Sequence, residues 1–263
     1  MLKVLAIAGM LALAQAPSDP HLPSPVMDQV APSLPDGLSG AVLIVSKTNG
    51  WRHLEHIPHS NQVLEEIAHG LGRGSYVTEN AAVFNDEQLS HFAVVVLNSA
   101  SGDFLTPEQK AAFTRFVGRG GGVVALHAAG DNSHTNKWYA DTIIGTTFIG
   151  HPGGDDHIQT ARIVIGQSRH PIMKGVRTPW SLPDEWYSFS SNPVARGMIV
   201  LAEVDETSYR PGAKLQMGKH PVMWVNPQAR GRVFYSALGH DPAAYDDPNY
   251  RRILVNAIRW AAR

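Results

Sequence analysis

One histidine stands where a buried apolar run ends. The segment GGGVVALHAAGD, residues 120–131, reads as a glycine turn and a short apolar strand followed by His127. In open α/β sheets the ligand crevice lies at the carboxyl ends of the strands. A neutral imidazole at such an end suits a general base or a metal ligand. We therefore predict a functional His127. The alternative is a ring that only hydrogen-bonds backbone and closes the strand.

A second histidine follows the last predicted strand. His240 lies in ALGHDP, where Gly239 leaves the ring room to turn. Beside a carboxylate, this ring could serve as an oriented acid or base, or share a divalent metal such as Zn²⁺ with His127. Asp241 could supply that carboxylate and contact substrate, or it could cap the loop by accepting from backbone N–H groups. Both roles of Asp241 stay open.

The segment DEWY, residues 184–187, places carboxylates beside aromatic rings. Rings that pack on sugar C–H groups, with carboxylates that accept from the hydroxyls, can hold a carbohydrate. We predict Glu185 as a catalytic carboxylate for substrate or metal, and Trp186 and Tyr187 as substrate-binding rings. The alternative is a surface turn with Trp186 in the core.

Other candidates follow further predicted strands. His53 is expected as a polar wall of the crevice, and Asp131 as a substrate-binding carboxylate. His53, His56 and His59 lie in WRHLEHIPH, whose spacing is a weak metal motif because Pro58 interrupts it. His151 and His157 in GHPGGDDH, with Asp155 and Asp156 between them, are another loose metal-binding possibility. Most of these histidines are expected to be solvated loop residues.

Alternating strand and helix patterns must position these side chains. Apolar runs predict strands at residues 41–46, 75–79, 92–98, 123–127, 159–165, 198–204, 221–227 and 231–238. Helical spacing predicts a helix near residues 63–71 capped by Ser60 or Asn61, and one that begins with a Thr106–Gln109 capping box. Further helices are expected at 137–144 and 248–262. Repeated strand, helix and strand units predict a parallel sheet with helices on both faces.

Composition narrows the classes of function. The chain has 263 residues, of which 43% are hydrophobic and 17% charged, so it can bury one large α/β domain. The net charge of -1 argues against nucleic acid as a partner. Cysteine is absent, which excludes disulfides, thiolate metal sites and cysteine nucleophiles.

The amino-terminal region has the pattern of an exported protein. Residues 1–16 combine one lysine, an apolar run and an A-x-A ending, which predicts a signal peptide; a buried amino-terminal helix or strand is the alternative. Residues 17–39 are proline-rich and read as a spacer, and residues 40–263 as a single domain. The expected location is periplasmic or secreted, with no membrane association after cleavage.

Six segments in order resemble the ThuA-like family, the trehalose-utilisation group of the class I glutamine amidotransferase-like superfamily. They are SKTNGWRH, GGGVVALHAAGD, HPIMKGV, DEWYSF, PVMWV and GRVFYSALGHD with the closing WAAR. The resemblance covers residues 41–262 and implies a flavodoxin-like three-layer α/β sandwich with a mostly parallel central sheet, and a link to sugar metabolism.

The resemblance also implies roles for the two histidines. His127 is similar in position to the nucleophilic cysteine of glutamine amidotransferases, and His240 to their triad histidine. Without a thiol, ammonia release through a thioester cannot occur. We therefore expect an enzyme that acts on a sugar or keto-sugar derivative by histidine acid/base chemistry or metal-assisted hydrolysis or elimination. A carbohydrate-binding module without turnover is the alternative, and a homo-oligomer stays open.

Overall fold

The computed structural model describes residues 19–134 and 136–263. Its strands are β1 (Ala41–Val45), β2 (Ser75–Thr78), β3 (Phe92–Asn98), β4 (Gly122–Leu126), β5 (Phe148–Gly150), β6 (Gln159–Ile165), β7 (Trp180–Asp184), β8 (Ser188–Phe189), β9 (Ile199–Val204), β10 (His220–Asn226) and β11 (Val233–Ser236). Its helices are α1 (Ile57–Gly70), α2 (Asp86–Leu89), α3 (Pro107–Gly118), α4 (Lys137–Tyr139), α5 (Pro242–Asp246) and α6 (Pro248–Ala261). The predicted helix at residues 137–144 is α4 continued by one π-helical turn.

The central sheet is mixed, with most strands running in one direction. In the part of the chain that the structure describes, nine strands form it in the order β2-β1-β3-β4-β11-β10-β9-β6-β7. The pairs from β2 to β11 are parallel, and those from β11 to β7 are antiparallel. Only β10 and β6 therefore run against the others. The predicted α/β class with a mostly parallel sheet is confirmed.

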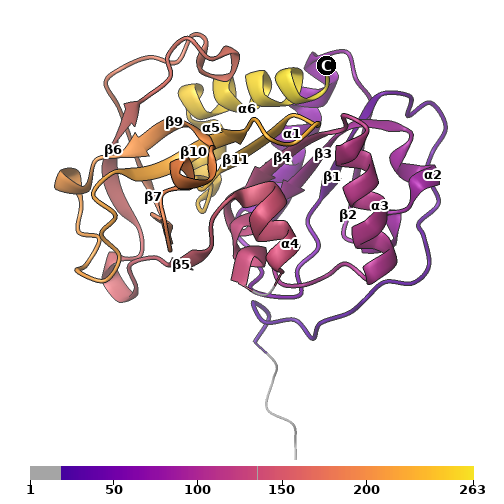
Figure 1. Cartoon of the computed structure of the whole chain (residues 1–263), viewed down its shortest axis with the longest axis horizontal. Helices are drawn as coiled ribbons and strands as arrows, with labels where there is room; N and C mark the ends of the chain where they lie inside the picture. Colours follow the sequence, from indigo (N-terminus) through magenta and orange to yellow (C-terminus); the bar gives the residue numbers. More distant parts are fainter. Residues whose placement is uncertain (1–18, 135) are drawn as a thin grey trace, which may run out of the picture.

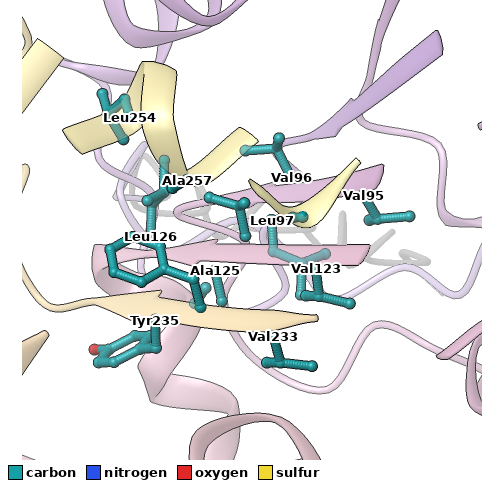
Figure 2. Packing of buried hydrophobic residues seen from close by; sticks show 14 of the residues in the cluster. Val95, Val96, Leu97, Val123, Ala125, Leu126, Val233, Tyr235, Leu254 and Ala257 are labelled. Carbon is teal, nitrogen blue, oxygen red and sulfur yellow. The ribbon is translucent and has the colours of Figure 1, made fainter. Parts of the chain in front are cut away.

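Helices cover both faces of the sheet, which gives three layers. Helices α1, α5 and α6 pack together on one face, and α2 and α3 pack together on the other. In Figure 1, α6 runs along the top of the sheet, while α3 and α4 lie lower in the view. Figure 2 shows Leu254 and Ala257 of α6 on one side of β3, β4 and β11, with Tyr235 on the other side. The strands between these layers are buried on both sides, as their continuous apolar runs predict.

Local signals predicted one helix start correctly and another wrongly. The Thr106 hydroxyl accepts from the Gln109 backbone and the Gln109 side chain accepts from the Thr106 backbone, so the capping box is confirmed. Helix α1 instead begins at Ile57, ahead of the predicted caps, because Pro58 fits the first helical turn. Ser60 and Asn61 accept from the Asn98 side chain at the end of β3.

The packing of α6 on β4 leaves no room at Gly122. A Cβ there would lie 2.2 Å from the Ala261 carbonyl oxygen. We expect Gly122→Ala to lower the free energy of unfolding by about 2–3 kcal/mol in urea titrations, because backbone must move. Gly118, near the end of α3, has open space around its Cα. Gly118→Ala should instead stabilise by about 0.5–1 kcal/mol. Equal effects of the two variants would contradict this packing.

The predicted spacer lies against the domain where the structure describes it. Residues 19–39 contain no helix or strand. Asp28 nevertheless pairs with Lys47 (2.8 Å) and accepts from the Ala81 backbone, and its carbonyl accepts from Gln109. Leu38 belongs to the hydrophobic core. The segment is thus fixed along the domain.

The predicted signal peptide, residues 1–16, lies outside the described residues and stays a prediction. Among the residues that are described, no helix has the length and apolar character needed to cross a bilayer.

Candidate functional site

Two neighbouring strands end in residues with unusual backbone. His127, after β4, has a φ of 48°, and Ser99, after β3, has a φ of 51°. Residues other than glycine rarely adopt this left-handed backbone region, although asparagine, aspartate and histidine do so more often than the others. The Tyr235 hydroxyl donates to the His127 carbonyl oxygen (3.1 Å) and helps to hold the turn. Backbone strain of this kind gathers at functional sites, and here it marks the edge of the sheet where the sequence predicts the crevice.

The His127 ring is oriented by one hydrogen bond. Its Nδ1–H donates to the Ala237 carbonyl oxygen (2.8 Å), so Nε2 is the ring nitrogen that faces the cluster. That Nε2 lies 3.3 Å from the His53 Nε2 and 3.4 Å from the Glu185 Oε2. The ring has no exposed surface. His127 therefore meets the site only through its Nε2.

Asp184, for which no role was predicted from the sequence, holds the loop that carries His240 in position. Its fully buried carboxylate accepts from the backbone N–H groups of Gly239 (2.9 Å), His240 (3.0 Å) and Glu185 (2.9 Å). Burial raises the pKa of Asp184, while the three N–H groups act in the opposite direction. The end of β7 thereby fastens the loop that follows β11. Its place in DEWY was the only signal in the sequence.

His56 supports His240 from behind. The His56 Nδ1–H donates to the His240 carbonyl oxygen (2.7 Å), and the Ser99 hydroxyl donates to the His56 Nε2 (2.7 Å). Burial and the neighbouring His127 lower the pKa of His56, which keeps its ring neutral. His56 is fully buried, so the expectation of a solvated loop histidine is wrong for this residue. Its position three residues after His53, which was predicted to line the crevice, could have suggested that His56 also contacts the site.

Glu185 is the centre of the cluster. Its Oε2 lies 3.2 Å from the His240 Nδ1 as well as close to His127, and its Oε1 lies 3.1 Å from the His151 Nδ1. Burial alone would raise the pKa of Glu185, but the bonds to His127 and His240 outweigh it and hold that pKa well below its usual range. Glu185 is therefore an ionised carboxylate surrounded by imidazoles. From its sequence alone, His151 was expected only as part of a loose metal-binding possibility with His157.

The imidazoles differ in their electrostatics. Burial lowers the pKa of His240, but the Glu185 carboxylate raises it by more, and the net direction is upward. Burial and then His127 lower the pKa of His53 far below its usual range. Among the described residues, the buried His53 Nδ1 has no hydrogen-bond partner. His53 is thus a neutral ring whose Nε2 faces His127 and whose Nδ1 is unsatisfied.

A cavity of about 670 Å³ opens onto this cluster. Its walls are formed by rings, acidic side chains and a glycine turn: His21, Trp51, His53, Glu55, Asp131, Phe148, His151, Gly153, Gly154, His157, Glu185, Tyr187 and His240. Burial, and then the Glu185 charge, raise the pKa of Asp131 to about 8, so this carboxyl is largely protonated at neutral pH. Its Oδ1 has no hydrogen-bond partner within the described part of the chain. The cavity therefore offers donors and acceptors next to apolar rings.

Two predicted substrate-binding residues lie away from the cavity. Trp186 is only 1% exposed, and its indole N–H donates to the Gln159 carbonyl oxygen. Asp241 accepts from the Ala243 backbone as the N-cap of α5. We correct both assignments, because Trp186 is a core residue and Asp241 serves backbone. Tyr187, the next residue after Trp186, does line the cavity.

The cluster fits the donor set of a divalent metal. One donor atom from each of His53, His127, Glu185 and His240 lies within 4.8 Å of the others. Ligands at about 2.0–2.1 Å from a tetrahedral Zn²⁺ lie about 3.3 Å apart. Three of the six separations between these donors, 3.2, 3.3 and 3.4 Å, lie close to that value, and all six are within 4.8 Å. A backbone carbonyl that orients the opposite ring nitrogen, as Ala237 does for His127, is the usual support of a metal-binding histidine.

This geometry separates the two roles predicted for His127. The ring has no exposed surface and does not line the cavity, so it is not placed for direct proton transfer to a substrate there. Its free Nε2 can still bind an ion held between His53 and Glu185. The arrangement therefore favours His127 as a ligand.

Comparison with known proteins agrees with this picture. The sheet and the site at its carboxyl edge define an α/β protein of the glutamine amidotransferase-like class. The chain belongs to the ThuA family, described as trehalose utilisation, whose pattern matches residues 41–261.

Solved structures share the fold. A ThuA-like protein from Bacteroides uniformis is 23% identical with a TM-score of 0.72, over 88% of this chain and 94% of its own. One from Parabacteroides merdae is 20% identical with a TM-score of 0.66, over 85% and 90%. A protein from Thermoplasma acidophilum described as part of a GMP synthase has a TM-score of 0.52 at 8% identity, over 85% and 94%. A search of curated proteins found no relative.

Proposed function

We propose that this chain is an exported, metal-dependent enzyme that acts on a sugar or keto-sugar derivative by hydrolysis or elimination. His53, His127, His240 and Glu185 would hold one divalent ion such as Zn²⁺. The observation that carries the proposal is the gathering of these four donors within 4.8 Å, with three of their separations close to those of ligands on a tetrahedral ion. Export rests on residues 1–16 of the sequence alone.

The ion would supply a Lewis acid that polarises a substrate oxygen and lowers the pKa of a bound water or hydroxyl. His151 lies on the open side of the cluster, where its Nδ1–H donates to the Pro152 carbonyl oxygen (2.8 Å) and lies 3.1 Å from the Glu185 Oε1. A ring held in this way suits proton transfer to or from a substrate in the cavity. Asp131 and Tyr187 on the walls would position the substrate.

The substrate class is supported by the family description and by the lining of the cavity. The ThuA family is described by trehalose utilisation. Apolar rings beside carboxyl and imidazole groups suit a polyhydroxylated ring, which has C–H faces and hydroxyl edges.

Metal content tests the proposal first. Protein purified without a polyhistidine tag is expected to carry about one divalent ion per chain by elemental analysis. Removal by a chelator should lower the melting temperature. Zn²⁺ at about 100 times its Kd should then restore about 2.7 kcal/mol of stability. Protein that holds a sub-stoichiometric ion and gains no stability from added metal would rule out the metal site.

Turnover separates an enzyme from a binding module. The mature chain would be incubated with trehalose, other disaccharides and their keto forms, and the products followed by chromatography. The proposal expects product formation that stops after chelation and returns with metal. Binding of a sugar with no turnover in the metal-loaded parent would favour the carbohydrate-binding alternative.

A further inference from the structure

We propose that Trp51, with His21 stacked on it, forms a second sugar-binding subsite of the cavity, separate from the histidine cluster. The reacting ring of a two-ring substrate would lie at the cluster and the other ring against the indole. This inference rests on the proposed function, because it assumes a carbohydrate in the cavity. It adds a subsite and two residues for which no role was predicted from the sequence.

Trp51 is a large apolar side chain that lines the cavity and is exposed to solvent. It is 43% exposed, whereas Trp180, Trp186 and Trp224 are at most 4% exposed. Both Trp51 and His21 line the same cavity as His53 and His240. An exposed indole beside polar groups is a frequent ligand contact, since it offers a broad apolar face at little cost in side-chain entropy.

The His21 ring stacks on Trp51 with centroids 4.8 Å apart and planes 14° from parallel. The backbones of His21 and Arg52 are joined by a bond from the Arg52 N–H to the His21 carbonyl (2.8 Å). The His21 Nδ1–H donates back to the Arg52 carbonyl (2.8 Å), and the Ser101 hydroxyl donates to the Trp51 carbonyl (2.6 Å). The pair is therefore held in place before a ligand arrives, which reduces the entropy lost on binding.

An acidic side chain completes this side of the cavity. Glu55 lines it, and its Oε1 lies 3.7 Å from the His21 Nε2. This carboxylate is well exposed, so it is free to accept hydrogen bonds from sugar hydroxyls. An aromatic face and an acceptor together suit a sugar ring better than a purely apolar ligand.

The size of the cavity argues for two rings. Its volume of about 670 Å³ corresponds to about 22 water molecules at about 30 Å³ each. A hexose has about 12 non-hydrogen atoms and a disaccharide about 23, and covalently bonded atoms each take less space than a water molecule, so one ring fills well under half of the cavity. A ring at the cluster thus leaves room for another beside Trp51.

Binding of one-ring and two-ring sugars tests this inference. Affinities of the zinc-loaded protein for glucose, trehalose, maltose and cellobiose would be measured by calorimetry. Trp51→Ala is expected to weaken binding of the preferred disaccharide about tenfold and that of glucose less than about twofold. Trp51→Phe, which keeps an aromatic face, should stay within about threefold of the parent. His21→Ala removes the ring stacked on Trp51 and should weaken disaccharide binding by about threefold to fivefold, with less than about a twofold effect on glucose. Zinc content should not change in any variant.

Each alternative outcome has its own meaning. Unchanged disaccharide affinity in Trp51→Ala would overturn the inference and leave the proposed function intact. Equal losses for glucose and the disaccharide would overturn the two-ring assignment, because Trp51 would then contact the reacting ring. A zinc-loaded parent that binds none of the four sugars would overturn both this inference and the carbohydrate part of the proposed function.

Discussion

His127→Ala is expected to lower the affinity for Zn²⁺ by more than about 100-fold, because loss of a ligand should exceed the effect of losing a supporting group. The His127 Nε2 is the donor that lies near both His53 and Glu185. Competition with a chromophoric chelator would measure the affinity. Turnover of any sugar substrate should fall in proportion to the zinc lost from this variant.

His59→Ala is the matched control. His59 comes from the same histidine-rich segment as His53 but contacts Asp246 outside the cluster. This variant should keep the zinc affinity of the parent. Parental zinc affinity in His127→Ala as well would remove His127 from the metal site.

The stabilities of two variants at position 127 test whether the backbone there is left-handed. Glycine is normally less stable than alanine in regular structure. At a φ of 48°, however, alanine is strained by about 1–2 kcal/mol. His127→Gly should therefore unfold at a higher urea concentration than His127→Ala, although glycine also removes the Cβ and leaves a slightly larger cavity. The opposite order would contradict the left-handed turn after β4.

Asp184→Ala should have the second largest effect. The substitution leaves the N–H groups of Glu185, Gly239 and His240 without their buried acceptor. We expect a loss of about 3–5 kcal/mol in the free energy of unfolding. Zinc affinity should fall as well, because the loop that carries His240 is released. Urea titration and chelator competition measure the two effects.

Two controls separate these effects. Asp184→Asn retains the volume and one acceptor oxygen, so its losses should be smaller on both measures. Asp241→Ala removes a helix cap on the same loop but outside the cavity, and should cost about 1 kcal/mol without a change in zinc affinity. If Asp184→Ala binds zinc as tightly as the parent, the carboxylate does not position His240.

The strands in the parallel half of the sheet could be predicted from the sequence, whereas β7 and β8 could not. Strands such as β3 and β4 are continuous apolar runs, and α3 carries a complete capping box, so local patterns suffice there. Strand β7 contains Pro183, and β8 has two residues, so neither has a local strand signal. Their places depend on pairing with β6 and β5.

The site was predicted in outline and completed by long-range contacts. His127 and His240 were placed together because strand ends in such sheets share an edge, whereas Glu185 was assigned from the carboxylates and rings of DEWY. Trp186 and Tyr187 show what adjacency in sequence cannot tell, because one ring is in the core and the next lines the cavity. The roles of His56 and Asp184 come from hydrogen bonds to the His240 loop, far away in sequence.

Short-range composition was enough to establish the class of fold, the absence of thiol chemistry and the histidines at strand ends, because each depends on residues that are neighbours in the chain. The side-by-side order of β4 and β11 decided the rest. That order joins His127 to Ala237, 110 residues further along, and so leaves one ring nitrogen free to face Glu185. Separations of 3.2–3.4 Å between such distant donors arise only from packing, since backbone connectivity sets no distance over that length.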